Sequence, residues 1–194
     1  MAEYELIAVG ASWGGLHAVG DLLETLPDEV TAPLVLAQHR SPDSEAGGLE
    51  RLLQLHTTRT VREAGDKDPI RERHVYVAAP DYHLLVDEGS FALSLDERVQ
   101  YSRPSIDVLF ESVADAYGER AIGIILTGAN ADGAAGLARI KERGGVAIVQ
   151  DPGTAERAAM PEAAIAATVA DAILPLAEIG PFLYGLCCGT PEAA

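Results

Sequence analysis

Cysteine is nearly absent from this chain of 194 residues. Its only two cysteines, Cys187 and Cys188, are adjacent, so they cannot join distant segments through disulfide bonds. Their spacing also matches no common metal site. We therefore expect no disulfide framework, no bound metal and no cofactor, and a reducing cytoplasm suits such a chain. We place the pair on the last helix.

Basic residues are also scarce, because 14 Lys and Arg stand against 30 Asp and Glu, which gives a formal net charge of −16. Nucleic acids and anionic lipid surfaces carry charge of the same sign, so they are repelled unless a local patch reverses it. We therefore expect no nucleic-acid partner.

Long apolar runs are missing as well. No stretch approaches the roughly 18 to 20 apolar residues of a membrane-spanning helix, and the first residues lack the basic start and apolar core of a signal peptide. We predict a cytoplasmic protein without direct membrane insertion.

Short apolar runs that alternate with helical patterns are present along almost the whole chain. This alternation is typical of βαβ units and predicts an α/β fold with a mainly parallel sheet covered by helices on both faces. The length favours one domain, over residues 1–188, followed by a loose tail at 189–194. We expect strands at residues 6–9, 34–37, 59–62, 74–78, 122–126, 146–149 and 172–174.

Helical spacing of apolar residues predicts helices at 16–26, near 49–53, at 104–118 and around 137–140. The fixed φ of Pro104 suits a first helical position, and Gly144 and Gly145 end the fourth helix. Residues 83–95 alternate instead around a polar turn, which predicts a β-hairpin and hence one antiparallel insertion in the sheet.

The turn after the first strand carries the most informative residue, Ser12. It follows an apolar strand that breaks at Gly10, and Gly14 and Gly15 lead into the next helix. A hydroxyl at such a turn is pushed out of the sheet edge, beside backbone N–H groups that can receive negative charge. Ser12 is therefore a candidate nucleophile.

Two other side chains that suit acyl transfer follow strands, at the sheet edge where ligands collect in open α/β folds. His39 follows the second predicted strand and can act as a base, and Asp132 follows the fifth and can orient the imidazole. Two alternatives stay open from the residues alone. Asp132 could cap the helix through Leu137, and Asp151, at another strand end, could be the orienting carboxylate.

Other interpretations of the glycine-rich turn fit less well. A dinucleotide cradle fails because Ser12 occupies the place of the middle glycine. The usual α/β-hydrolase needs strands before its nucleophile and a histidine after its acid, and almost nothing precedes Ser12 here.

Several separated motifs occur in one order along nearly the whole chain. They are Gly10-Ala11-Ser12 with Gly14-Gly15, Gln38-His39, the run from Arg103 to Phe110, Leu126-Thr127-Gly128, Asp132-Gly133-Ala134, Gln150-Asp151-Pro152 and Met160-Pro161. In this order they resemble the catalytic domain of CheB, the protein-glutamate methylesterase of bacterial chemotaxis.

The resemblance implies a doubly wound, Rossmann-like domain outside the usual α/β-hydrolase fold. It implies hydrolysis of glutamyl γ-methyl esters on chemoreceptors or another methyl-esterified protein, with glutamine deamidation as a second activity. By position Ser12 would be the nucleophile, His39 the general base and Asp132 the orienting residue, which leaves Asp151 a structural role. The candidates for the oxyanion contacts and the substrate pocket are Ala11, Trp13, Gly14, Gly15, Gly128, Ala129 and Asn130.

The chain departs from the family pattern at Trp13, where threonine is common, and at Ala129-Asn130, where a methionine-glycine pair is common. It also begins about five residues before its first predicted strand, so we expect no receiver domain. Either the activity is then ungated, or control comes from a separate response regulator or adaptor protein.

An acidic substrate protein would need local positive charge on this acidic chain, and Arg40, Arg103 and Arg157 are candidates for it. Two rival functions remain. One is a small-ester serine esterase on the same scaffold, and the other is a non-catalytic module that binds an anion or a protein at the Ser12 turn.

Overall fold

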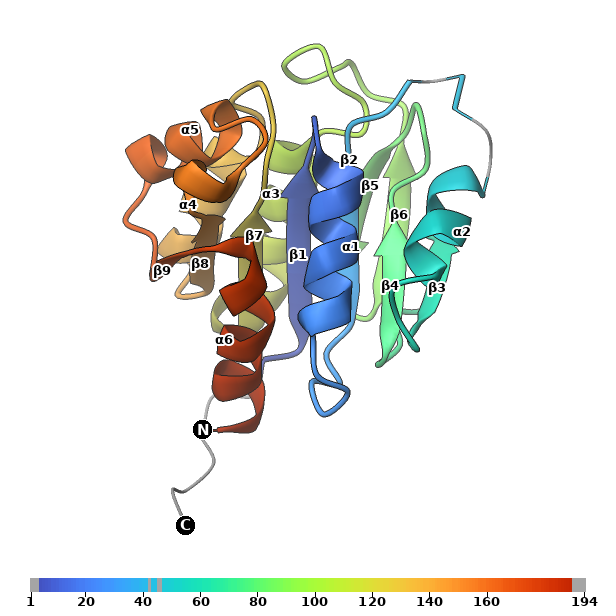
Figure 1. Cartoon of the computed structure of the whole chain (residues 1–194). Helices are drawn as coiled ribbons and strands as arrows, with labels where there is room; N and C mark the ends of the chain where they lie inside the picture. The colour runs from blue at the N-terminus through green and yellow to red at the C-terminus, as the bar shows by residue number, and fades with distance from the viewer. Residues whose placement is uncertain (1–3, 42, 45–46, 190–194) are drawn as a thin grey trace.

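The computed structural model describes residues 4–41, 43–44 and 47–189, which form a layered α/β fold (Figure 1). The predicted tail lies outside these residues except for Gly189. A seven-stranded parallel sheet has the order β3-β4-β2-β1-β7-β8-β9. Its strands are β1 (Leu6–Ala11), β2 (Leu34–Gln38), β3 (Thr60–Glu63), β4 (His74–Val77), β7 (Ala121–Ile125), β8 (Val146–Gln150) and β9 (Ala172–Leu174). The predicted strands are confirmed to within one or two residues.

Helices cover both faces of the sheet, which explains why the central strands are continuously apolar. Every residue of β1, β2 and β7 is buried. On one face lie α1 (Gly15–Thr25), α2 (Gly48–Gln54) and α6 (Leu176–Cys188), and on the other lie α3 (Ile106–Tyr117), α4 (Ala134–Glu142) and α5 (Ala159–Ala167). Short 3₁₀ turns occur at η1 (Gly118–Arg120) and η2 (Pro152–Thr154).

The start of α3 corrects one expectation. The helix begins at Ile106, and Ser105 is its N-cap, with a hydroxyl that accepts a hydrogen bond from the Val108 amide at 3.4 Å. Pro104 therefore lies before the helix and not at its first position. Serine takes the cap because its side-chain oxygen satisfies an amide that has no partner within the helix.

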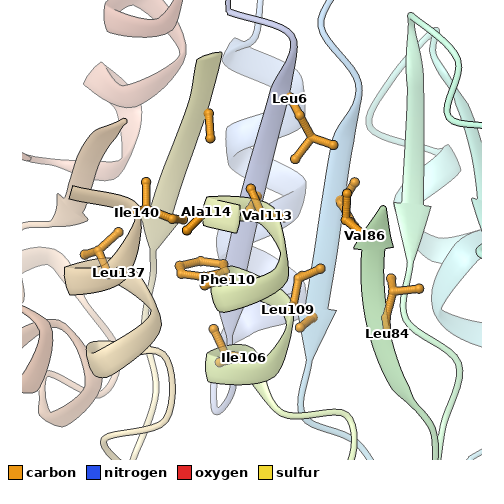
Figure 2. Packing of buried hydrophobic residues seen from close by; sticks show 14 of the residues in the cluster. Leu6, Leu84, Val86, Ile106, Leu109, Phe110, Val113, Ala114, Leu137 and Ile140 are labelled. Carbon is orange, nitrogen blue, oxygen red and sulfur yellow. The ribbon is translucent and has the colours of Figure 1, made fainter. Parts of the chain in front are cut away.

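The predicted hairpin is present as β5 (His83–Asp87) and β6 (Ser90–Ser94). The expectation that it is inserted in the main sheet is wrong, because it forms a separate two-stranded sheet. The hairpin packs on α3 instead: Leu84 and Val86 of β5 lie beside that helix (Figure 2) and belong to the same buried cluster as its Leu109. A hairpin alone is marginally stable, so this packing stabilises it.

The cysteine pair ends α6, as expected, and burial raises the pKa of the Cys187 thiol to about 11. The thiol is therefore protonated near neutral pH. Within the described part of the chain, no helix is long and apolar enough to cross a membrane.

The packing of α3 on the sheet depends on the absence of a side chain at Gly10. A Cβ atom at Gly10 of β1 would lie 2.4 Å from Cγ2 of Ile106. Glycine thus lets the first turn of α3 approach the end of β1, at the edge of the sheet where Ser12 follows.

Candidate active site

Ser12, His39 and Asp132 meet at the C-terminal edge of the sheet. Ser12 and His39 directly follow β1 and β2, and Asp132 lies in the connection between β7 and α4. The Ser12 Oγ atom is 3.1 Å from His39 Nδ1, and His39 Nε2 is 2.7 Å from Asp132 Oδ2. Asp132 is fully buried, whereas the His39 side chain is 13% exposed. The three groups thus form a relay that opens to solvent at the serine end.

The two hydrogen bonds of His39 assign its tautomer. An ionised carboxylate only accepts hydrogen bonds, so Nε2 carries the proton that faces Asp132. The lone pair of Nδ1 then faces the Ser12 hydroxyl, which donates to it. This is the arrangement in which a neutral imidazole can remove the serine proton.

Four donors hold the Asp132 carboxylate. Oδ1 accepts from the Ser105 hydroxyl at 2.8 Å and the Asp107 amide at 3.0 Å, and Oδ2 accepts from His39 and, at 2.8 Å, from the Ile106 amide. Burial alone would raise the pKa of Asp132, but these hydrogen bonds, with that of His39 the strongest, outweigh burial and lower it. Asp132 therefore stays ionised.

The helix-cap alternative for Asp132 is wrong for α4, whose N-cap is Gly133 in a left-handed conformation (φ 95°). The carboxylate instead accepts from the first amides of α3. Asp151, the rival orienting group, accepts from the Gly153 amide at 2.8 Å and caps η2.

A second buried carboxylate, Asp107, was missed by the sequence analysis. Its Oδ1 accepts from the amides of Gly133 at 2.9 Å and Gly136 at 2.7 Å, and its Oδ2 accepts from Gln100 Nε2 at 2.8 Å. Burial raises the pKa of Asp107, with the charge of Asp132 adding to the effect and the Gly136 amide opposing it. Polar residues at a helix start are cap signals, and Ser105 and Asp107 could have been flagged for that reason.

The backbone around Ser12 is fixed from two sides. The Ser12 amide donates to the Thr127 carbonyl at 3.0 Å, so it cannot serve as an oxyanion donor. The Ser12 carbonyl accepts from Gln38 Nε2 at 2.8 Å and from the Gly15 amide at 2.9 Å. Among the hydrogen bonds of residues 4–41, 43–44 and 47–189, none uses the Trp13 amide. The N–H of Trp13, the residue that follows Ser12, is therefore unpaired within that part of the chain.

Several pocket candidates have structural positions. Ala11 is buried, and its carbonyl accepts from the His39 amide at 3.1 Å. Gly14 is left-handed (φ 77°), and a Cβ at Gly15 would lie 2.2 Å from Gln38 Oε1. The Gly128 amide donates to the Arg157 carbonyl at 3.1 Å. The amides of Gly15 and Gly128 are therefore used within the fold, whereas that of Gly14, like that of Trp13, donates to no group among the described residues.

The remaining pocket candidates, Trp13, Ala129 and Asn130, are exposed or partly exposed. Ala129 is exposed, and Asn130 Oδ1 accepts from the Asp132 amide at 3.3 Å. The Trp13 side chain is 58% exposed. Its Nε1 donates to Glu156 Oε1 at 2.8 Å, and the Arg157 guanidinium lies 5.5 Å from its ring centroid. The Trp13 ring is therefore held in place by Glu156 and Arg157.

His39 lies between two hollows of different character. One, of about 260 Å³, combines the apolar side chains of Leu16, Leu49 and Leu52 with polar residues that include Arg40. The other, of about 170 Å³, includes Arg40 and Arg103. Within the described residues, no group of three or more His, Cys, Asp or Glu side chains is arranged to hold a metal ion.

Comparisons with known proteins fit this site. The family model described as CheB methylesterase matches residues 7–183. The chain belongs to the CheB methylesterase family. Members of this family are named protein-glutamate methylesterases, so the chain is a carboxylic ester hydrolase. The crystal structure of the Thermotoga maritima CheB methylesterase catalytic domain superposes with a TM-score of 0.89 at 30% identity, over 95% of this chain and 99% of that one.

Two relatives show the range of the family. A Leptospira interrogans protein, provisionally named a protein-glutamate methylesterase/protein-glutamine glutaminase, is 49% identical over 91% of this chain and 92% of its own length. The protein-glutamate methylesterase FrzG of Myxococcus xanthus is 39% identical over 91% of this chain and 53% of its own length. The doubly wound fold predicted from the sequence is that of the CheB catalytic domain.

Proposed function

We propose that this chain is a protein-glutamate methylesterase that hydrolyses glutamyl γ-methyl esters on a methylated chemoreceptor or a similar methyl-esterified protein. The observation that carries the proposal is the relay from Ser12 Oγ to His39 Nδ1 at 3.1 Å and from His39 Nε2 to Asp132 Oδ2 at 2.7 Å. The relatives are named protein-glutamate methylesterases, which supports the substrate class.

The first half of the reaction forms an acyl-enzyme. His39 Nδ1 takes the Ser12 proton as Oγ attacks the γ-carbonyl carbon, and the Trp13 amide donates to the oxyanion that forms. Asp132 stabilises the imidazolium through Nε2–H. The C–O bond to the methoxy group then breaks, and the imidazolium gives its proton to the departing oxygen, which leaves as methanol.

The second half regenerates the enzyme. Water attacks the acyl carbonyl while His39 Nδ1 takes one of its protons. The C–O bond to Ser12 breaks, and Oγ recovers a proton from the imidazolium. A glutamate side chain with an unesterified carboxylate remains on the substrate protein. With a glutamine substrate the leaving group is ammonia, and the same steps give deamidation, which the glutaminase part of the relatives' names supports.

The regulatory partner and the cellular location belong to this proposal. A separate response regulator or adaptor protein would control access to Ser12, and the reaction would take place in the cytoplasm. A pull-down with the full chain from cells grown with and without attractant would identify such a regulator. Recovery of a protein with a receiver domain in only one of these two growth conditions would support control by a separate regulator.

Methanol release from a methylated chemoreceptor preparation tests the activity. The wild-type chain should release methanol, whereas Ser12→Ala and His39→Ala should each lose nearly all of it. A fluorophosphonate probe should label Ser12 in the wild type and not in His39→Ala. Hydrolysis of short aryl esters without methanol release would replace the proposal with the small-ester esterase. Absence of labelling in well-folded protein would replace it with the binding module.

A further inference from the structure

The smaller hollow beside His39 is unusually basic for so acidic a chain. It is lined by His39, Arg40, Arg98, Tyr101, Ser102, Arg103 and Pro104. Three arginines thus line a space of about 170 Å³ that no carboxylate lines within the described residues, although the whole chain carries a net charge of −16. Arg40 and Arg103 were expected near the site, and Arg98 was not.

The arginines at the rim are only partly neutralised. Arg98 and Arg103 share one oxygen of Asp81, Oδ1, at 3.3 and 2.9 Å. Arg103 also donates to the carbonyls of Leu95 and Asp96, which fixes it. Arg98 is 51% exposed and donates, among the described contacts, only to Asp81. One carboxylate therefore serves two guanidinium groups, and Arg98 keeps donors free at the mouth of the hollow.

Arg40 lines both hollows beside His39. Its side chain is 8% exposed, and its Nη2 donates to the Ala78 carbonyl at 2.8 Å and to Glu63 Oε2 at 3.2 Å. A second carboxylate, Glu50, lies 3.6 Å from Nη1. Arg40 is thus already paired, and the free positive charge of the hollow lies with Arg98 and Arg103.

The segment that carries Arg98 is held in place. Val99 and Ser102 exchange two backbone hydrogen bonds, at 3.2 and 2.8 Å, around a turn in which Gln100 and Tyr101 have positive φ. The Gln100 amide donates to Asp107, which also supports the start of α4. Tyr101 is left 95% exposed at the mouth of the hollow. The backbone that carries Arg98 is therefore fixed relative to α3 and α4.

We propose that this hollow is a subsite for a carboxylate of the substrate, an Asp or Glu side chain close to the esterified glutamate. A guanidinium group recognises a carboxylate through paired, charge-assisted hydrogen bonds, and this specificity suits the rim position of Arg98. Among the described residues, the hollow on the other side of His39 includes only one arginine, Arg40, and this residue is already paired with Glu63 and Glu50. The subsite rests on the proposed function for the identity of its substrate, though its charge preference can be measured without it.

Matched peptides test the subsite. Each carries one γ-methyl glutamate, flanked by Asp and Glu in one series and by Asn and Gln in the other. The ratio of kcat/KM for acidic over neutral peptides should exceed one in the wild type and fall about fivefold in Arg98→Gln. Arg98→Lys should keep part of the preference, and salt should weaken it in the wild type.

Arg143→Gln is the matched control. Arg143 is 48% exposed and shares Oδ1 of Asp115 with Arg139, as Arg98 shares Asp81, but it lies at the opposite end of the sheet, between α4 and β8. Its ratio should equal that of the wild type. Near-UV circular dichroism of both variants verifies that they are folded.

A second pair of substrates separates the subsite from the proposed function. p-Nitrophenyl hemiadipate and p-nitrophenyl hexanoate differ by one terminal carboxylate, and their enzyme-dependent rates can be compared even if no methyl ester is cleaved. Failure of both peptide series with turnover of the aryl esters would overturn the proposed function alone. A wild-type ratio of one in every pair that is turned over, or an Arg98→Gln ratio equal to the wild type, would overturn the subsite.

Discussion

Asp132 and Asp107 hold the starts of each other's helices. The Asp132 carboxylate, just before α4, accepts from the amides of Ile106 and Asp107 at the start of α3. The Asp107 carboxylate, on α3, accepts from the amides of Gly133 and Gly136 at the start of α4. Each negative charge thus lies at the positive end of a helix dipole. The orienting group of the relay is therefore fixed by the packing of two helices.

Asp132→Asn should lower turnover by about 10⁴-fold, as loss of the orienting carboxylate does in other triads. An amide nitrogen in place of Oδ2 would face the Ile106 amide and favour the His39 tautomer with its proton on Nδ1. Stability should also fall, by about 1–3 kcal/mol, because buried donors lose their acceptor. Urea unfolding and single-turnover methanol release measure the two effects.

Asp151→Asn is the control for that substitution, because Asp151 caps η2 and should leave the rate near the wild-type value. Near-normal turnover in Asp132→Asn together with loss in Asp151→Asn would reverse the assignment of the orienting carboxylate.

The two carboxylates should affect acid stability in opposite directions. The pKa of Asp132 is lowered in the folded state, so its stabilisation is present above the unfolded value of about 3.8 and is lost as pH falls through the folded pKa. The pKa of Asp107 is raised, so its contribution is largest below about 3.8 and is lost as pH rises through the folded pKa. Urea midpoints measured from pH 2 to 7, at steps of about one unit, follow both effects.

Relative to the wild type, Asp132→Asn should flatten the loss of stability on the acid side of about pH 3.8. Asp107→Asn should instead remove a decline on the alkaline side of that value. The same slope change in both variants would contradict the opposite pKa shifts.

Asp107→Ala should impair both stability and turnover, although Asp107 touches no reacting atom. Loss of the acceptor for Gly133 and Gly136 should cost about 1–2 kcal/mol, as for other helix caps. Asp107→Asn can keep Oδ1 as acceptor, with Gln100 turning its own amide to match, so it should restore most of the rate. Comparison of kcat for the two variants distinguishes positioning from charge, since a role for the charge itself would leave Asp107→Asn as slow as Asp107→Ala.

Gly15→Ala should displace Gln38 from the nucleophile turn. The new Cβ would lie 2.2 Å from Gln38 Oε1 and 2.8 Å from the Ala11 Cβ, so the bond from Gln38 to the Ser12 carbonyl would break. We expect a loss of about 1–3 kcal/mol in stability and, from a displaced nucleophile, of about 10²-fold in the rate of fluorophosphonate labelling. Gly185→Ala, with no atom within 4 Å of its Cβ, should show neither loss.

The sequence located the strands and the relay because both depend on local patterns. Apolar runs marked the buried strands, and Ser12, His39 and Asp132 were found as polar residues that follow strands sharing one edge. The supports of Asp132 were missed for a physical reason. The amides of Ile106 and Asp107 are backbone groups, which any residue type provides, so their direction toward Asp132 follows only from the packing of α3 on β1.

Other features also depended on tertiary structure. The hairpin pattern predicted β5 and β6, but whether they joined the main sheet was decided by the apolar surface of α3. Likewise, the ring nitrogen of His39 that faces Ser12 depends on the direction from which each neighbour approaches the imidazole.

The relay draws on three neighbouring strands in the middle of the sheet, β2, β1 and β7, while β3 and β9 form its two edges. Insertions or sequence drift at either border can therefore remodel the outline of the molecule without moving the reacting groups.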